Sequence, residues 1–480
     1  MKNWWSKGRL LRFAFALLTL WGTPHAIQAQ KPNVLMITAD DLGIQLGCYG
    51  DKAARTPVLD ELASRGCLFE NAYVAQASCS PSRSAMFTGL YPHANGQYGL
   101  LNAGVGFALT EQAQAQTIPQ VLKREGYSTG IIGKLHVGVE SKFPFDERMR
   151  ADTRDVRSVA EQVGAFFEKT ASPFFLMANF SDPHVMKSRP GFPDEVFPNQ
   201  YQGVPADPLQ IGQVPPLPFQ RLNHPQQIAR TTQFYNAASR FDYGVGLLLE
   251  RLAAAGHADD TLIILVGDHG PPFFRGKTSC YEGGVHVPMI VVWPQVTEPG
   301  LRSKALVSTV DILPTILDAV GSQHQIQQHG QSLRGAVHND EFRDYLATEF
   351  HYHGSRPFYP RRSIRDMRFK LIHNLRSGEE QPGSTIDGDA ALRLARESQS
   401  MDPQVLSAYE RSAAPPEFEL FDLTQDPWEF TNLAGLDEYR QDLQRMQAAL
   451  MQWRKTTDDP LLTDAGWSEV GKYQHKTPDR

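Results

Sequence analysis

The sequence predicts an α/β protein. We expect a large domain with a mainly parallel mixed sheet flanked by helices, followed by a smaller C-terminal α+β domain with an antiparallel sheet. Apolar runs of strand length that alternate with helical stretches favour the large domain. A weakening of that rhythm near residues 358–362 favours the second. With 480 residues, 41% of them hydrophobic, the chain can bury a core of this size.

Four apolar runs have the length and composition of buried strands: Val34–Thr38, Gly130–Gly133, Phe174–Phe180 and Leu262–Val266. Continuous runs of this kind suit a sheet that is covered on both faces. Three helical stretches accompany them: Thr56–Ser64, Thr117–Glu125 and Gln227–Ala255. A glycine follows each stretch closely, as is common where helices end. This order predicts a sheet whose strands are mainly parallel.

The C-terminal part has a different pattern. Two strand-like pieces, Arg368–Asn374 and Glu417–Asp422, precede a helical stretch, Leu436–Thr456. We therefore divide the chain into a signal peptide (1–29), a catalytic domain (30–360) and a C-terminal α+β subdomain (361–480).

The N-terminus has the layout of a secretory signal peptide. Basic residues precede an apolar run, Phe13–Trp21, and a small residue, Ala29, follows at a plausible cleavage position. The alternative is a membrane anchor, but the run is short for a bilayer span. We expect an exported protein, periplasmic or secreted (lysosomal in a eukaryote), with no membrane span after cleavage. Cleavage would leave 43 basic and 53 acidic residues, a net charge of −10.

Charge and cysteine content exclude two classes of protein. The formal net charge of −6 argues against a protein that binds nucleic acid through bulk positive charge, and we expect no nucleic-acid partner. Four cysteines in 480 residues cannot form a disulfide framework that holds the fold together. A cysteine in a conspicuous setting is therefore examined first for chemistry.

Ionisable residues follow each of the four predicted strands directly. In chain order these are Asp40 and Asp41, Lys134 and His136, Asp182 and His184, and Asp268 and His269. The carboxyl ends of parallel strands meet at one edge of an open α/β sheet, where sites form. One such pair would be an ordinary helix cap or turn, but four together predict a shared active site.

The stretch Cys79-Ser80-Pro81-Ser82-Arg83, followed by Thr88-Gly89, is the most specific in the sequence. A cysteine among Ser, Pro and Arg at a predicted helix start is a nucleophile candidate, whereas a structural cysteine would sit in an apolar run. The free N–H groups of a helix N-terminus also favour an anionic substrate.

This stretch resembles the signature of the type I sulfatases, which belong to the alkaline phosphatase superfamily. Further matches are Asn33–Asp41, Gly133–His136, Asp182–His184 and Leu420–Leu433. The resemblance implies an alkaline phosphatase-like fold. It also implies that a formylglycine-generating or sulfatase-maturing enzyme converts Cys79 to formylglycine, whose hydrate is the nucleophile.

The resemblance implies a divalent metal held by Asp40, Asp41, the modified Cys79, Asp268 and His269. Carboxylates favour a hard cation, Ca²⁺ first and Mg²⁺ as the alternative. His269 stands where many members have Asn, and a nitrogen donor leaves the metal preference open.

The resemblance also assigns catalytic roles. Arg83, Lys134 and Lys277 would stabilise charge on the sulfate oxygens. His184 would donate a proton to the leaving group, and His136 would assist the release of sulfate.

Several runs resemble the sulfamidase (N-sulfoglucosamine sulfohydrolase) subfamily: Cys79–Gly89, Asn95–Leu100, Gly130–Gly138, Tyr359–Leu375 and Glu419–Ala434. The last three are less general than the sulfatase signature and therefore bear on the subfamily. The expected function is hydrolysis of a sulfamate or sulfate ester on a sulfated sugar, with N-sulfoglucosamine of heparan- or heparin-type saccharides as the leading substrate. The alternatives are an O-sulfatase for a 6-O-sulfated amino sugar or another sulfate ester, a phosphodiester or phosphonate hydrolase, and a non-enzymatic sulfoglycan-binding protein. The partners expected are the sulfated saccharide and the maturation enzyme, with a second copy in a homodimer as a further candidate.

His353 and Arg362 match sulfamidase-like positions and are candidates for sugar contacts. Between residues 356 and 376 there are seven basic residues and one acid. This stretch is either a solvated basic edge or an electropositive rim that attracts a polyanionic sugar to an otherwise acidic protein.

Overall fold

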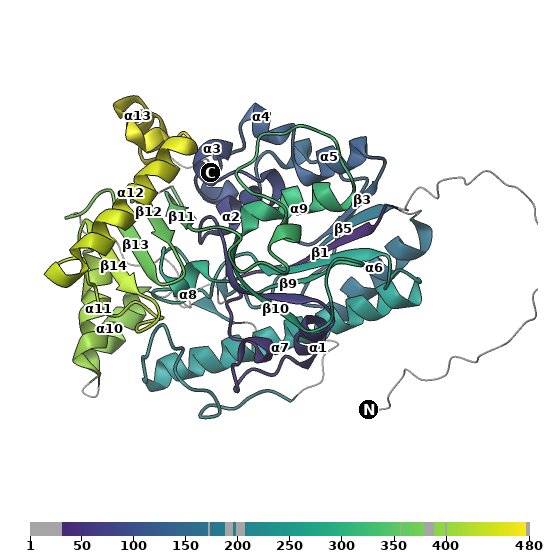
Figure 1. Ribbon diagram of the computed structural model, residues 1–480. Coiled ribbons are helices and arrows are strands. Elements are labelled where there is room, and N and C mark those ends of the chain that lie inside the picture. Colours follow the sequence, from purple (N-terminus) through teal and green to yellow (C-terminus); the bar gives the residue numbers. More distant parts are fainter. Residues whose placement is uncertain are drawn as a thin grey trace, which may run out of the picture. The chain divides into compact units, whose positions relative to one another are not determined.

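The computed structural model describes residues 31–170, 173–187, 195–197, 207–355, 357–378, 388–398 and 401–476. The predicted signal peptide lies outside these ranges. From Pro32 onward the described chain forms one unit that contains a large and a small sheet (Figure 1). None of the helices in the ranges above has the length and apolarity that a bilayer crossing needs.

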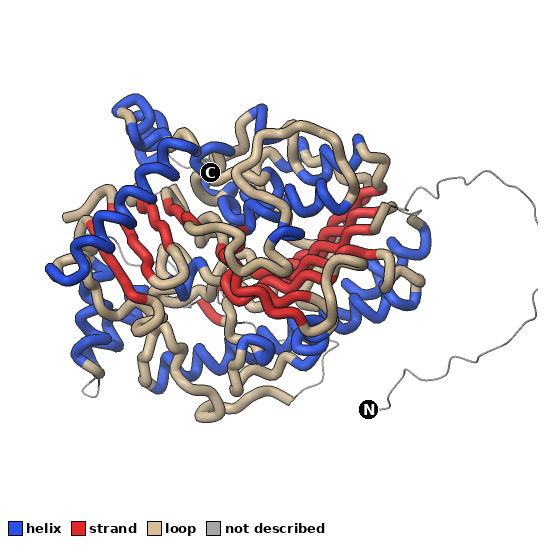
Figure 2. The backbone as a smooth tube through the Cα atoms, viewed as in Figure 1, coloured by secondary structure: helices blue, strands red, loops and turns tan. Residues whose placement is uncertain are grey.

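Eight strands of the described chain form the large sheet, in the order β10-β2-β9-β8-β1-β5-β3-β4 (Figure 2). They are β1 (Asn33–Ala39), β2 (Cys67–Tyr73), β3 (Ser128–Ile132), β4 (Glu147–Met149), β5 (Phe174–Phe180), β8 (Thr261–Gly267), β9 (Met289–Val292) and β10 (Leu301–Ser308). Strand β9 is antiparallel to its neighbours β2 and β8, whereas the remaining neighbours pair in parallel. The prediction of a mainly parallel mixed sheet is confirmed.

The four strands predicted from apolar runs are adjacent in this sheet, in the order β8-β1-β5-β3, and all are parallel. Their register places Thr38 beside Val266 on one side and Asn179 on the other. The residues that follow each strand therefore emerge at the same edge of the sheet. This arrangement brings distant segments of the chain to one site.

Both faces of the large sheet are buried, as continuous apolar strands require. In β1, Val34 and Met36 join one hydrophobic cluster while Leu35 and Ile37 join the other. The first cluster is covered by α2 (Cys79–Thr88), α5 (Ile118–Arg124) and α9 (Ile312–Ala319), and the second by α1 (Pro57–Ser64), α6 (Val156–Lys169) and α7 (Pro225–Ala254). The three helices expected from the sequence correspond to α1, α5 and α7.

The small sheet is antiparallel, in the order β11-β12-β13-β14. Its strands are β11 (Leu346–Phe350), β12 (Arg361–Arg365), β13 (Phe369–Asn374) and β14 (Phe418–Asp422), and α12 (Arg440–Thr456) packs Met446 and Leu450 against it. Strand β11 precedes the division at residue 360, which stays a prediction. The remaining elements are α3 (Pro92–Asn95), α4 (Glu111–Gln114), β6 (Met186–Lys187), β7 (Glu195–Val196), α8 (Glu282–Val285), α10 (Gly388–Glu397), α11 (Pro403–Ala413) and α13 (Asp464–Gly471).

Candidate active site

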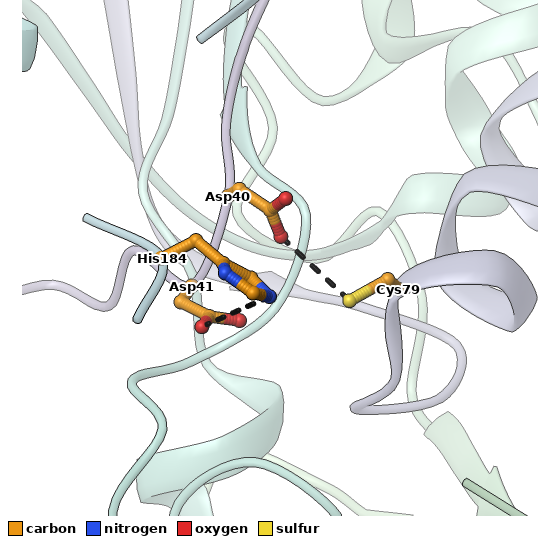
Figure 3. Close-up of side chains that lie close together, drawn as sticks. All are labelled: Asp40, Asp41, Cys79 and His184. Atoms are coloured by element: carbon orange, nitrogen blue, oxygen red, sulfur yellow. Dashed lines mark hydrogen bonds and ion pairs between the residues drawn. The ribbon is translucent and has the colours of Figure 1, made fainter. Parts of the chain in front are cut away.

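Cys79 occupies the first turn of α2, directly after the N-cap residue Ser78. Its side chain is buried, with Sγ 3.2 Å from Nε2 of His269 and 3.7 Å from Oδ1 of Asp40. Figure 3 shows the sulfur pointing from α2 toward Asp40, with Asp41 and His184 nearby. The positive end of the α2 dipole therefore faces a group of acids and imidazoles.

The acids and His269 come from the ends of β1 and β8. Asp41 has a left-handed backbone (φ 69°), and its N–H donates to Oδ1 of Asp268 at 3.0 Å. Nε2 of His269 lies 3.3 Å from Oδ1 of Asp41 and 3.6 Å from Oδ1 of Asp268. A left-handed φ is uncommon outside glycine, and at Asp41 it accompanies the turn in which this N–H reaches the Asp268 carboxylate.

These residues fit a divalent cation. One atom from each of Asp40, Cys79, Asp268 and His269 lies within 4.8 Å of the others, and the same holds for the set Asp40, Asp41, Cys79 and His184. Oδ2 of Asp41 is buried and has no hydrogen-bond partner, which is costly for a carboxylate oxygen unless something else binds it. The donors of the two sets are three carboxylates, two imidazoles and the sulfur of the unmodified Cys79, and the carboxylate oxygens suit a hard cation.

Each of three acids is paired with one cation. Lys134 Nζ lies 2.7 Å from Asp40, Lys277 Nζ lies 2.6 Å from Asp41, and Arg83 Nε lies 3.0 Å from Asp268; the acids, Lys277 and Arg83 are buried, whereas the Lys134 side chain is 27% exposed. Arg83 also donates to the carbonyl of Lys134 at 3.1 Å and to Oδ1 of Asn179 at 3.0 Å. The cluster is thus held rigidly by charge-assisted bonds.

The electrostatics of the site favour negative charge at position 79. Burial alone would raise the pKa of the unmodified Cys79 thiol, but the positive charges of Lys134, Lys277 and His269 hold that pKa well below its usual range. For His269, burial alone would lower the pKa of the imidazole. The charge of the Asp268 carboxylate outweighs this effect and raises the pKa to about 9. The carboxylate of Asp268 therefore favours a positive charge beside it.

Two further histidines border the cluster. His184 is one-third exposed, with Nε2 4.0 Å from Oδ2 of Asp41, and the charges of Asp41 and Asp40 raise its pKa against the effect of burial. His136 has a left-handed φ of 56°, and its Nε2 lies 3.1 Å from Oδ1 of Asn102. Nδ1 of His136 is buried without a hydrogen-bond partner. The raised pKa of His184 favours its protonated form, and the free nitrogen of His136 can accept a proton, so both rings are suited to proton transfer.

Comparison with known proteins agrees with this geometry. The profile of the family described as Sulfatase matches residues 32–322, more than half of the chain. The chain belongs to the sulfatase family. A second profile, described as the C-terminal part of N-sulphoglucosamine sulphohydrolase, matches residues 267–382.

Individual relatives cover nearly the whole of this sulfatase. Human N-sulphoglucosamine sulphohydrolase is 33% identical, with 91% of this chain and 92% of the human protein covered. An ulvan-active sulfatase from Formosa agariphila is 27% identical, with coverages of 94% and 87%. A solved protein in complex with its substrate D-glucosamine-2-N,6-O-disulfate superposes with a TM-score of 0.66 at 21% identity, covering 91% of this chain and 99% of that one. The predicted family, fold and enzyme class, a hydrolase of sulfate esters or sulfamates, are confirmed.

The structure also brings His353 to the site of this sulfatase. Its Nδ1 lies 3.0 Å from Oγ of Ser78, the residue before Cys79. Burial and the charge of Lys277 lower the pKa of His353 to about 3, so its imidazole is neutral. A neutral, partly exposed imidazole next to the nucleophile position could bind a sugar hydroxyl, so its predicted role stays open to test.

Arg362 is not placed with the other predicted residues. Its side chain is fully buried and donates to both carboxylate oxygens of Asp459, at 2.9 and 2.7 Å. It also donates to Nε2 of His351 at 3.1 Å, and Nδ1 of His351 lies 3.1 Å from Oε1 of Gln76. Gln76 precedes Cys79 by three residues, so Arg362 supports the loop before α2 and offers no exposed surface to a sugar.

The basic stretch 356–376 is mostly internal, contrary to both expectations for it. Among its described residues Arg361, Arg362, Arg365 and Lys370 are buried. Lys370 pairs with Glu282 at 2.9 Å and with another buried glutamate, and Arg365 also approaches Glu282. These charges join the small sheet to the rest of the protein, because a buried charge requires a partner.

Sequence reasoning missed several supporting residues. Asn179 accepts hydrogen bonds from both Arg83 and Thr38. It was detectable as the one amide within the apolar run Phe174–Phe180. Arg240 of α7 donates to Asp182 at 2.8 and 3.2 Å and so fixes the turn that carries His184, but no local signal marked this pair.

Proposed function

We propose that this sulfatase hydrolyses the sulfamate of N-sulfoglucosamine in heparan- or heparin-type saccharides. The observation that carries the proposal is the position of Cys79 Sγ, which faces Asp40 and His269 at the positive end of α2. The sugar specificity is supported by the match of residues 267–382 to the C-terminal N-sulphoglucosamine sulphohydrolase profile and by 33% identity to the human enzyme.

Cys79 is proposed to be oxidised to formylglycine by a maturation enzyme, so its Sγ stands in for an oxygen of the modified side chain. When present, the hydrated aldehyde supplies the oxygen nucleophile and a divalent metal polarises the sulfate oxygens. The remaining steps belong to unmodified residues. Lys134, Lys277 and Arg83 stabilise negative charge on the sulfate oxygens.

Proton transfer is assigned to the two bordering histidines. His184 holds a proton at its partly exposed imidazole and passes it to the departing amine nitrogen of the sugar. His136 offers its free Nδ1 as a base for the release of sulfate. Asn102 orients this ring through Nε2, at 3.1 Å.

The metal is proposed to be Ca²⁺, with Mg²⁺ as the alternative. Asp40, Asp41, Asp268, His269 and the modified Cys79 would hold it, and the unpartnered Oδ2 of Asp41 is the atom that most needs such a ligand.

Export, removal of residues 1–29, the division at residue 360 and assembly into a homodimer remain proposals from the sequence. Export and cleavage can be tested by N-terminal sequencing of the protein recovered from the periplasm or the medium. A mature N-terminus near residue 30 is expected.

The direct test is sulfate release from a panel of N-, 6-O- and 2-O-sulfated glucosamine and uronate saccharides, together with a phosphate diester and a phosphonate ester. We expect the highest kcat/KM for N-sulfoglucosamine. Preference for a 6-O-sulfated sugar would replace the proposal with an O-sulfatase, and preference for the phosphorus esters would replace it with a phosphodiester or phosphonate hydrolase. Sugar binding without turnover by formylglycine-bearing protein would identify a binding protein.

A further inference from the structure

Two adjoining hollows lie beside the catalytic cluster, at the carboxyl edge of the large sheet next to β4. Their volumes are about 320 and 370 Å³, within the range of pockets that bind small ligands, about 300–1,000 Å³. Four residues line both hollows: Gly133, Lys134, Met149 and Arg150. The hollows therefore adjoin along the end of β4, and together they are called the depression.

Two of the proposed catalytic residues line this depression. Lys134 lines both hollows, and His136 lines one of them. Lys134 lies between them, with its ammonium on Asp40 of the catalytic cluster. A group bound against the far wall of the depression, at the end of β4, would thus lie next to these two catalytic residues.

The wall formed by the end of β4 carries two exposed guanidinium groups. Arg150 makes no ion pair with any residue that the structure describes, and Arg148 donates only to backbone carbonyls, of Glu140 at 2.9 Å and Phe143 at 2.7 Å. The two acids of the lining already accept backbone N–H groups: Glu140 accepts that of His136, and Asp152 that of Arg154. Both acids keep their negative charge, but no ion pair joins either of them to Arg150, whose guanidinium is exposed in the wall.

We propose that this depression is a subsite for the sugar next to the one that loses sulfate, and that Arg150 binds the anionic group of that neighbour. The inference rests on the proposed function, because heparan-type chains alternate the amino sugar with a uronic acid. A uronate carboxylate is the group to which a guanidinium binds in a fixed, bidentate geometry. The enzyme then acts on the end of a chain more efficiently than on a single sugar.

The test compares kcat/KM for sulfate release from the N-sulfoglucosamine monosaccharide with that for a tetrasaccharide that ends in the same sugar. The wild-type protein prefers the tetrasaccharide. R150A lowers the ratio of the two values about fivefold, the effect of losing one solvent-exposed ion pair. R150E lowers the ratio about 25-fold because it adds repulsion, and R150K retains most of it.

Two controls isolate the interaction. Arg157 of α6 is also exposed but lines neither hollow, and R157A leaves the ratio unchanged. A tetrasaccharide whose uronate carboxyl groups are reduced to alcohols loses the wild-type preference, whereas one that lacks only 2-O-sulfate keeps it. If the carboxyl-reduced tetrasaccharide kept the preference and the one without 2-O-sulfate lost it, Arg150 would bind a sulfate, and the assignment to a carboxylate would be overturned.

A wild-type ratio near one, or equal ratios for wild type, R150A and R150E, would overturn the subsite and leave the proposed function standing. Release only from O-sulfated sugars would overturn the proposed function, and the same ratio measured on that substrate would still decide the subsite. Absence of sulfate release from every saccharide would overturn both.

Discussion

Replacement of Arg362 by alanine separates a structural role from contact with the sugar. The guanidinium is fully buried and donates to both oxygens of Asp459 and to His351. Removing one partner of a buried ion pair costs about 3–5 kcal/mol. Asp459 keeps a second partner, Arg454, at 2.7 Å, so R362A should lie near the lower end of that range. We expect a loss of about 3 kcal/mol in the free energy of unfolding.

This loss can be measured as a thermal midpoint. Unfolding entropy is about 2.1 cal/mol/K per residue, so the roughly 450 residues from Pro32 onward give about 0.9 kcal/mol/K, and the midpoint should fall by about 3 °C. KM for N-sulfoglucosamine, measured well below the midpoint, should not change. R393A is a matched control, because it removes an exposed pair with Glu397 and should cost under about 1 kcal/mol. A tenfold rise in KM for R362A at an unchanged midpoint would refute the structural role and restore the predicted sugar contact.

Three further predictions concern a buried acid, a turn and the metal. Burial raises the pKa of Asp242 from 3.8 to about 7. Between pH 4 and pH 7 the folded protein therefore keeps a proton on Asp242 that the unfolded chain loses, so the free energy of unfolding falls by about 1.4 kcal/mol per pH unit, whereas below pH 4 the contribution of Asp242 is complete. D242N keeps an acceptor for the Leu59 N–H, and its free energy of unfolding in urea should lack this pH dependence. A slope identical to that of wild type would contradict the assignment to Asp242. R240A removes two charge-assisted bonds to Asp182, while Arg154 still pairs with Asp182 at 3.3 Å and donates to the carbonyl of His184. The turn that carries His184 is then held less firmly, so kcat should fall about tenfold, with partial recovery in R240K; unchanged kcat would exclude this positioning role. Dialysis against a chelator should abolish sulfate release and lower the thermal midpoint, and added Ca²⁺ should reverse both; a midpoint indifferent to chelator and Ca²⁺ would count against a bound metal.

The large sheet and the cluster at its edge follow from local sequence. Four of the five residues of Val34–Thr38 are apolar, a pattern that predicts a strand with both faces covered, and β1 spans Asn33–Ala39 with all seven residues buried. Asp40 and Asp41 follow it directly. Because parallel strands end at one edge, that proximity in sequence is sufficient to place them near Asp268 and His269 in space.

Long-range pairing of charges was not predictable in the same way. Lys370 belongs to a basic stretch that reads as surface, but its partner Glu282 lies 88 residues away in the chain. Likewise, Asp459 neutralises Arg362 from a distance of 97 residues. A local pattern reports the charge of a segment but not the carboxylate that a distant segment contributes. The prediction of a basic rim was therefore wrong for these residues. The Cys79–Arg83 motif, by contrast, lies within five consecutive residues and could be recognised from the sequence alone.

The central claim is that Cys79 is the nucleophile position of an N-sulfoglucosamine hydrolase. Its most direct test is sulfate release from N-sulfoglucosamine by wild-type and C79A protein, both coexpressed with a formylglycine-generating enzyme, with C48A as the control cysteine variant. We predict that mass spectrometry finds formylglycine at position 79, that wild type and C48A release sulfate, and that C79A is at least about a thousandfold slower. An intact thiol at Cys79 in active protein, or C79A activity within tenfold of wild type, would contradict the account.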